Sequence, residues 1–174
     1  MKNLNEKKEI LDSIENFVNE NEDIPFPQAN SFDLVLKTLN LVYSDVNSAS
    51  LISQCIGYAE REGKYYIDAL RYIGLAEKSQ KDGNYYLTED GFLLCACVDN
   101  RMNYRIIFKI LEHEVFYNTF KYVINNGEIP SIEIICKYMI ENGIVLSDDT
   151  LRRRASTVKG WVQWLINVDI YKEV

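Results

Sequence analysis

The chain has 174 residues, of which 47% are hydrophobic and 26% are charged, a composition typical of a soluble globular protein with one compact domain or two small ones. Its formal net charge of −7 counts against broad, non-specific attachment to nucleic acids, which are themselves negative. No apolar run approaches the ~20 residues of a membrane-spanning helix, and the start is too polar for a signal peptide. We therefore expect a cytoplasmic protein that makes no membrane contact.

The cysteines and the single histidine form no recognisable metal or catalytic motif. Of Cys55, Cys95, Cys97 and Cys136, only Cys95 and Cys97 are close in sequence, and their apolar surroundings are typical of buried filling residues. The paired C-x-x-C spacing of zinc sites is absent. His113 stands between two glutamates, and no serine or cysteine is marked as its catalytic partner. We expect no metal, no cofactor and no enzymatic activity.

Residues 1–30 are expected to form an N-terminal helical arm followed by a linker. Pro25 and Pro27 end the helical pattern and favour an extended connector. The arm either packs on its own domain, which is the favoured alternative, or mediates dimerisation. A helix over residues 5–21 would place on one stripe the side chains of Ile10, Leu11, Ile14, Phe17 and Val18.

The next segment, residues 31–99, has the element order of a winged helix: helix, short helix, helix, hairpin. Ser31 is a good N-cap for the first helix, and Gly74 is a good terminator for the third. In this interpretation the third helix is the recognition helix and the hairpin is the wing. The expected elements are helices over 31–43, 51–56 and 60–73, two short strands around Asp82-Gly83, and a helix that begins at Thr88.

The outer side of the third helix carries the polar residues that could contact DNA. Helical spacing places Arg61, Lys64, Tyr65, Asp68 and Arg71 there. Asp68 lies four residues after Lys64 and three before Arg71, so pairing within the helix would partly neutralise both cations. Arg61 and Tyr65 are therefore the better contacts, and Lys64 is a weaker one.

Residues 100–174 are expected to repeat the pattern as a second helix-turn-helix or winged-helix unit. A helical stretch over 103–125 is broken near 112–114, and a second helix begins at Pro130-Ser131 and ends at Asn142-Gly143. A basic third helix follows, and residues 168–174 would add a strand or a stub of wing. The sequence thus predicts a mainly α protein with two tandem winged-helix or helix-turn-helix units behind the N-terminal helical arm.

The basic third helix, residues 146–167, is the strongest functional signal in the chain. Ser147, Asp148 and Asp149 are N-cap candidates, and the carboxylates suit the positive end of a helix dipole. The alternative is an exposed helix whose arginines maintain solubility or pair with nearby carboxylates. One face is apolar, with Leu151, Ala155, Val158, Val162 and Leu165. Roughly opposite lie Arg152, Arg153, Ser156, Gly160 and Gln163, with Lys159 on the flank.

Two patterns together resemble a known family of DNA-recognition modules. Arg61-x3-Tyr65-Tyr66-x2-Ala69-x2-Tyr72-x-Gly74-Leu75 is followed by Tyr85-x-Leu87-Thr88-x2-Gly91, and Thr150-x-Arg152-Arg153-Arg154-x2-Thr157-Val158-x2-Trp161-x2-Trp164 stands in the second half. These patterns are similar to the tandem winged helices found with type II restriction endonucleases and related prokaryotic defence proteins. The resemblance implies a DNA-reading module from restriction-modification or phage defence.

The chain departs from such enzymes in one respect. A nuclease of the PD-(D/E)xK type needs clustered acids and a lysine beside strands to hold a divalent ion. No segment of the sequence offers room for that site, because the carboxylates fall on helix caps and solvent faces. If the resemblance holds, we expect the recognition half without the cutting half.

We therefore hypothesise sequence-specific binding of double-stranded DNA by tandem winged helices. Arg152, Arg153 and Lys159 would contact phosphates or guanines, and Ser156 and Gln163 would read base edges or adjust register. In the first unit Arg61 and Tyr65 would engage an adjacent groove, with Lys64 as a further contact.

The alternative hypothesis is a protein-binding winged-helix module that docks on, or inhibits, a nucleic-acid enzyme. The charge of −7 and the 12 tyrosines motivate it. Under either hypothesis, a nuclease or other protein subunit and a second copy of the chain are candidate partners.

Overall fold

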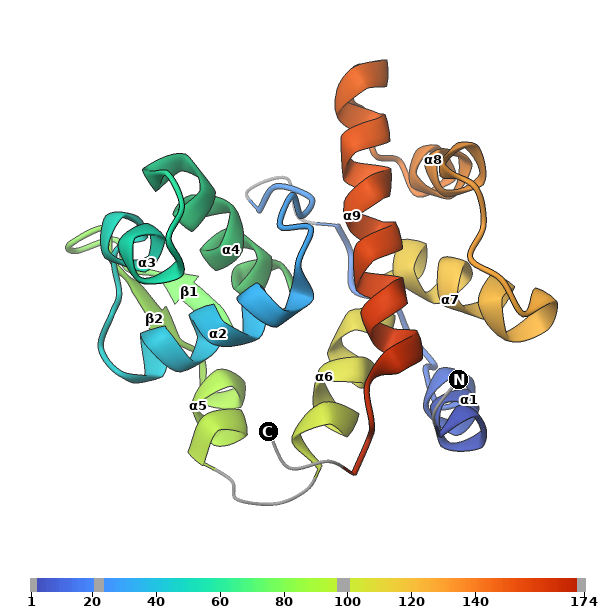
Figure 1. Cartoon of the computed structure of the whole chain (residues 1–174), viewed down its shortest axis with the longest axis horizontal. Helices are drawn as coiled ribbons and strands as arrows, with labels where there is room; N and C mark the ends of the chain where they lie inside the picture. The colour runs from blue at the N-terminus through green and yellow to red at the C-terminus, as the bar shows by residue number, and fades with distance from the viewer. Residues whose placement is uncertain (1–2, 21–23, 97–100, 172–174) are drawn as a thin grey trace. The chain divides into compact units, whose positions relative to one another are not determined.

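A computed structural model describes residues 3–20, 24–96 and 101–171. Within these ranges the protein is mainly helical, with nine helices and one two-stranded antiparallel sheet, as predicted (Figure 1). The chain divides into two compact units. Asn21–Val98 forms one of them, which we call the inserted unit because it interrupts the other in sequence. Met1–Glu20 and Asp99–Val174 together form the second, the discontinuous unit.

The inserted unit follows the predicted element order. Its helices are α2 (Phe32–Tyr43), α3 (Ala49–Ile56), α4 (Glu60–Tyr72) and α5 (Glu89–Ala96), and its strands are β1 (Ala76–Lys78) and β2 (Tyr85–Leu87). The hydroxyl oxygens of Ser31 and Ser48 accept hydrogen bonds from the third amide of α2 and of α3, respectively. Gly57, in the left-handed conformation at φ 80°, ends α3. Local capping chemistry therefore sets these boundaries.

The helices of the inserted unit pack around the inner side of α4. Ile67, Ala69 and Leu70 are fully buried there. Gly63 lets α3 and α4 approach closely, since a Cβ atom at this position would lie 2.3 Å from the Ala49 carbonyl oxygen. In the hairpin Ala76 pairs with Leu87, Glu77 with Tyr86 and Lys78 with Tyr85. The Tyr85 amide also donates to the Asn47 carbonyl, at 2.8 Å, which ties the hairpin to the segment before α3.

The discontinuous unit contains the remaining helices described. They are α1 (Leu4–Asp12), α6 (Met102–Leu111), α7 (Glu114–Asn126), α8 (Ile132–Glu141) and α9 (Asp148–Asn167). The break predicted near residues 112–114 is present, between α6 and α7. Trp161 of α9 is completely buried, with its ring centroid 5.1 Å from that of Phe116. The five apolar residues predicted on the inner face of α9 are all buried.

A buried lysine joins α1 to the end of α9. Lys7 is 0% exposed, and its Nζ donates to the carbonyl oxygens of Ile166 and Val168, at 3.1 and 2.6 Å. The last carbonyls of a helix lack partners within the helix and carry partial negative charge, so they accept an ammonium group well. The helical spacing of the sequence is consistent with this contact. Lys7 precedes the buried Ile10 and Leu11 by three and four residues and therefore lies on the same side of α1.

One predicted element of this unit is wrong, and a second is not found among the described residues. The N-terminal helix does not extend to residue 20, because it ends at Asp12, and the Ser13 hydroxyl donates to the Ile10 carbonyl (2.7 Å). Tertiary contacts then hold the extended chain, since the Val18 amide donates to the Glu112 carbonyl at 2.9 Å. Asn21 lies outside the described residues. The strand predicted after α9 is not present over residues 168–171, and residues 172–174 lie outside the described part of the chain.

Candidate nucleic-acid interface

The side of α9 opposite the core is lined by exposed polar residues. Since α9 advances ~100° per residue, residues 152, 156, 159 and 163 fall within an arc of about 60°. Arg153 lies beside this stripe. We call the α9 polar face the five residues Arg152, Arg153, Ser156, Lys159 and Gln163, all of them exposed.

The stripe has dimensions suited to a nucleic-acid groove. Arg152 and Gln163 are separated by about 16 Å along the helix axis, at ~1.5 Å per residue. The major groove of DNA is about 12 Å wide and admits one α-helix. Three cations, a hydroxyl and an amide are groups suited to phosphates and base edges.

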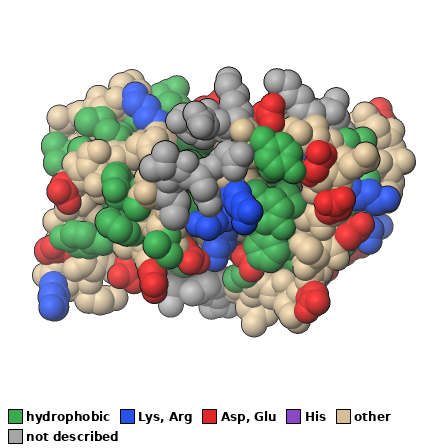
Figure 2. Space-filling view, turned by 90° about the horizontal axis from the view of Figure 1, so that it is seen from below, with side chains coloured by type: hydrophobic (Ala, Val, Ile, Leu, Met, Phe, Trp, Pro, Cys, Tyr) green, Lys and Arg blue, Asp and Glu red, His purple; other side chains and the backbone are tan. Residues whose placement is uncertain are grey.

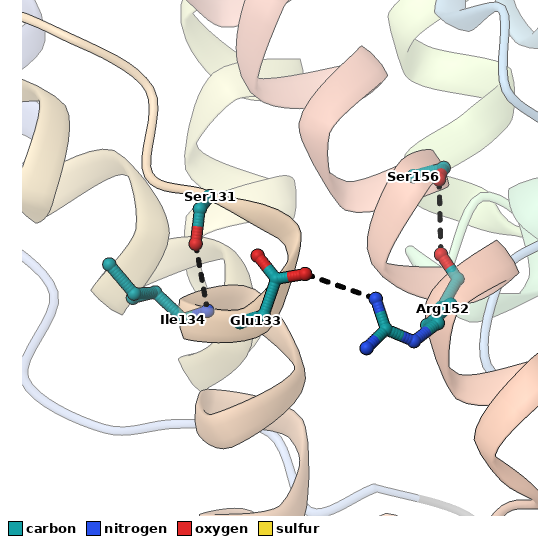
Figure 3. Close-up of polar contacts among 5 residues, drawn as sticks. All are labelled: Ser131, Glu133, Ile134, Arg152 and Ser156. Atoms are coloured by element: carbon teal, nitrogen blue, oxygen red, sulfur yellow. Dashed lines mark hydrogen bonds and ion pairs between the residues drawn. The ribbon is translucent and has the colours of Figure 1, made fainter.

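Arg152 is already paired with a carboxylate of the neighbouring helix. Its Nη1 lies 3.0 Å from Oε1 of Glu133 in the first turn of α8 (Figure 3). Both side chains are largely exposed, at 60% for Arg152 and 66% for Glu133. Pairing with a nearby carboxylate is the alternative role expected of the arginines from the sequence, and Arg152 makes such a pair.

Local hydrogen bonds define the surroundings of this pair. Ser131 caps α8 by accepting from the Ile134 amide, and the Ser156 hydroxyl donates to the Arg152 carbonyl at 3.0 Å (Figure 3). The pKa of the Glu133 carboxyl is lowered, first because its own backbone amide donates to it and then because Arg152 does. Glu133 is therefore ionised at neutral pH, and the pair is a true ion pair.

Acidic groups gather at the N-terminal end of α9. Asp148 and Asp149 are exposed in its first turn, where they suit the helix dipole. Arg153 Nη2 donates to the Thr150 hydroxyl at 3.4 Å, within the same helix. Acidic residues thus precede the three cations of the α9 polar face along the helix.

The outer side of α4 presents a smaller polar surface. Arg61 and Lys64 are exposed, and Tyr65 is half-buried. The Arg61 guanidinium lies over the Tyr65 ring, 5.5 Å from its centroid, and its Nε donates to the Tyr65 hydroxyl. These two predicted contacts therefore form one preorganised pair, one helical turn apart.

Asp68 does not lie on the outer side of α4, so that prediction is wrong. It is 5% exposed, and its carboxylate accepts from Nη1 of Arg71 at 2.8 Å. The predicted Asp68–Arg71 pairing is present, so Arg71 is not available as a cation for DNA. Asp68 faces inward because it lies near the hairpin. The pKa of the Tyr85 hydroxyl is raised by burial and next by the negative charge of Asp68, which is consistent with this position.

The hairpin carries charges of both signs. Lys78 Nζ lies 5.7 Å from the Tyr85 ring centroid, and Lys81 is exposed in the turn. The Asp82 carboxylate accepts from the Asn84 amide at 3.0 Å and from the Tyr86 hydroxyl at 2.8 Å. This turn is therefore ordered by its own side chains, and its net charge gives little attraction for phosphate.

The predicted site residues fall into two sets, one in each unit. The α9 polar face belongs to the discontinuous unit, whereas Arg61, Lys64 and Tyr65 belong to the inserted unit. Sequence reasoning missed Glu133, because its partner lies 19 residues away on another helix. The only signal for Glu133 is its position just after the cap Ser131, where an acidic residue is common.

The described residues offer little for metal chemistry. Among them, no group of three or more histidine, cysteine, aspartate or glutamate side chains is placed to hold an ion. Cys95 is half-buried, and burial raises the pKa of its thiol. Cys97, predicted with Cys95 to be an apolar filling residue, lies outside the described residues.

Comparison with known proteins places the chain in a family without assigning a role. A family model described as a domain of unknown function (DUF7226) matches residues 34–169, so the chain belongs to this family. The match runs from within α2 to just beyond α9, and it therefore includes both predicted sets of site residues. No curated protein and no solved structure matches the chain.

Proposed function

We propose that this DUF7226 member binds double-stranded DNA sequence-specifically through two tandem winged-helix or helix-turn-helix units. The observation that carries the proposal is the α9 polar face. Five side chains suited to phosphates and base edges are exposed along a helix whose opposite side forms the core of its unit. A helix anchored in this way presents its polar residues in a fixed register.

The order of elements in the inserted unit supports the winged-helix interpretation. The close approach of α3 and α4 at Gly63 is followed directly by the β1–β2 hairpin. The backbone bond between Asn47 and Tyr85 holds that hairpin beside the helix pair. In this interpretation α4 is a recognition helix with Arg61 and Tyr65 as contacts and Lys64 as a weaker one, and the hairpin is its wing.

In the discontinuous unit α8 and α9 take the place of the helix pair. The turn over residues 142–147 joins them, and α9 carries the recognition residues. We assign Arg152, Arg153 and Lys159 to phosphates or guanines, and Ser156 and Gln163 to base edges. Following the resemblance to restriction and defence modules, the chain would serve as a DNA-recognition module.

Selection of duplexes from a random pool tests this function directly. The full chain is incubated with random-sequence duplexes, and bound molecules are amplified and sequenced over several rounds. We expect an enriched motif whose labelled duplex changes fluorescence anisotropy on binding. If no duplex is enriched and anisotropy stays flat even at low salt, the proposal is wrong.

A charge-matched pair of double variants then locates the interface. Arg152→Ala with Arg153→Ala is expected to weaken binding by about 2 kcal/mol or more. It should also lower the salt dependence by roughly 0.9 to 1.8 in log–log slope, because Arg153 would supply a full phosphate contact and Arg152 is already paired with Glu133. Lys8→Ala with Lys121→Ala removes the same charge from exposed positions on α1 and α7. That control is expected to leave the slope unchanged, so equal losses in both variants would place the interface elsewhere.

A different surface favours a second candidate, docking on a nucleic-acid enzyme. Phe92 and Leu93 of α5 are 54% and 43% exposed, and the Phe92 ring lies 5.5 Å from that of Tyr43. Exposed Glu89 precedes Phe92 by three residues, and exposed Asp45 follows Tyr43 by two. Figure 2 shows one face of the molecule on which hydrophobic side chains are interspersed with acidic ones. Apolar surface with acidic neighbours complements the basic groove of such an enzyme.

This candidate predicts a partner that survives nuclease treatment. Phe92→Ser with Leu93→Ser is expected to abolish co-purification of a nucleic-acid enzyme and to relieve any inhibition of its activity. Leu51→Ser, at a 47% exposed position on α3, is the matched control. A partner that is lost with nuclease, or is retained by the double variant, would contradict docking at this surface.

A further inference from the structure

The ion pair between Glu133 and Arg152 lies on the surface proposed to meet DNA. The 3.0 Å contact joins α8 to α9 and involves the first cation of the α9 polar face. Both partners are more than half exposed, and exposed pairs contribute little to folding because water and salt screen them. The first turn of α8 favours a carboxylate at this position, but the contact of that carboxylate with Arg152 adds little to stability.

Several charges converge around this pair. Cys136 lies one turn after Glu133 on α8. Burial raises the pKa of its thiol, the Arg152 charge lowers this pKa, and the charges of Glu133 and Asp148 raise it. All three charged groups therefore lie close enough to act on the same thiol. Arg152 is paired with the Glu133 carboxylate before any DNA arrives, so an incoming phosphate must replace one anion with another.

Given the proposed DNA-binding function, we propose that Glu133 is a built-in competitor of DNA phosphate for Arg152, and that it sets the overall strength of attachment. When a phosphate takes the guanidinium, the Arg152–Glu133 bond is lost and the carboxylate is left near a second negative charge. Both effects act against binding. Neither depends on base sequence, so Glu133 lowers affinity equally for specific and non-specific duplexes.

The competitor has a consequence for counterion release. A cation already neutralised by a protein carboxylate neutralises less phosphate, so it displaces fewer counterions from DNA. Removing the Glu133 charge should therefore tighten binding and also steepen its dependence on salt. Removing a carboxylate elsewhere on α8 should do neither.

The experiment is a double-mutant cycle measured by anisotropy over a range of salt concentrations. It uses the full-length wild type, Glu133→Gln, Arg152→Ala and the double variant, each with the selected duplex and with a scrambled one. Glu133→Gln is expected to tighten both duplexes by a similar factor of about fivefold, with a slope steeper by up to ~0.9. In the Arg152→Ala background the same change should alter affinity by less than about twofold.

The matched control is Glu141→Gln, which removes an equal charge from α8. Glu141 pairs with Lys137 on its own helix at 3.7 Å and is 54% exposed. The inference is overturned if Glu133→Gln binds like the wild type, if Glu141→Gln gives the same gain, or if the gain persists without Arg152. If neither the wild type nor Glu133→Gln binds any duplex at the lowest salt, the proposed function itself fails.

Discussion

Lys7 and Val168 are 161 residues apart in sequence, yet the ammonium of Lys7 donates a 2.6 Å hydrogen bond to the carbonyl oxygen of Val168. A second bond, to the Ile166 carbonyl, occupies the same ammonium group. The charge is fully buried, and its cost is offset because the end of a helix offers partial negative charge at that point. The N-terminal segment is therefore part of the folded core of the discontinuous unit.

Lys7→Met should destabilise that unit. Methionine retains the apolar stem, but the carbonyls of Ile166 and Val168 lose the ammonium donor, which we expect to cost about 1–3 kcal/mol. The measurement is urea unfolding followed by tryptophan fluorescence, because both tryptophans of the chain lie on α9 and report this unit. Lys8→Met, at the exposed neighbouring position, is the control. Equal midpoints for the two variants would contradict a structural role for Lys7.

Gly63→Ala should loosen the packing of α3 on α4. The new Cβ would lie 2.3 Å from the Ala49 carbonyl oxygen and 2.8 Å from two atoms of Ser53, so the helices must separate. We expect a loss of about 1–3 kcal/mol in the inserted unit. Hydrogen exchange of α3 and α4 peptides measures it, with exposed Lys64→Ala as the control. Unchanged protection in both helices would show that the backbone accommodates the methyl group without cost.

The turn of the hairpin should respond to pH through Asp82. The Tyr86 hydroxyl, and next the Asn84 amide, hold the pKa of this carboxyl below its ordinary value. A lowered pKa means that the folded hairpin prefers the ionised form. Its contribution is therefore complete above the unfolded pKa and is lost as pH falls through the folded one.

Tyr86→Phe tests that contact, because it removes the donor and retains the ring. The Asp82 pKa should rise towards its ordinary value in a carboxyl ¹³C titration by NMR. Asp33, exposed in the first turn of α2, serves as the internal reference. A titration of Asp82 that is the same in both proteins would contradict the assigned cause.

Lys159 and Gln163 should differ in the kind of binding they provide, although both lie on one stripe of α9. Lys159→Ala should weaken all duplexes alike and lower the salt slope by about 0.9, as expected for one phosphate contact. Gln163→Ala should leave the slope unchanged and relax the preference at one base pair, at a cost of about 1–3 kcal/mol. Repeating the random-pool selection with each variant separates the two. The same motif selected by Gln163→Ala and the wild type would contradict base reading by this residue.

Sequence reasoning succeeded where structure is set locally. Ser31 and Ser131 were recognisable as helix starts because a capping hydroxyl needs only the amide three residues ahead. Gly74 and Gly143 were recognisable as ends because left-handed backbone favours glycine. The inner and outer sides of α9 followed from the period of the helix alone.

The same reasoning failed where a distant segment decides the outcome. Apolar spacing alone favoured continuing the first helix through Phe17 and Val18, whereas these residues are 40% and 47% exposed beyond its actual end. Asp68 was placed towards solvent because helical period does not reveal the hairpin near it. The Glu133–Arg152 pair joins two helices, so neither helix taken by itself predicts it.

The insertion of one unit into another fixes an order of events during synthesis. α1 leaves the ribosome before the other described elements, yet the carbonyls that receive Lys7 are made more than 150 residues later. At about 5–20 residues per second, Ile10 and Leu11 wait roughly ten to thirty seconds for their unit to be complete. The inserted unit has all its described elements once α5 has emerged, and it is therefore free to fold during that interval. The apolar side of α1 stays uncovered meanwhile, and the short length of this mostly charged helix limits that exposure.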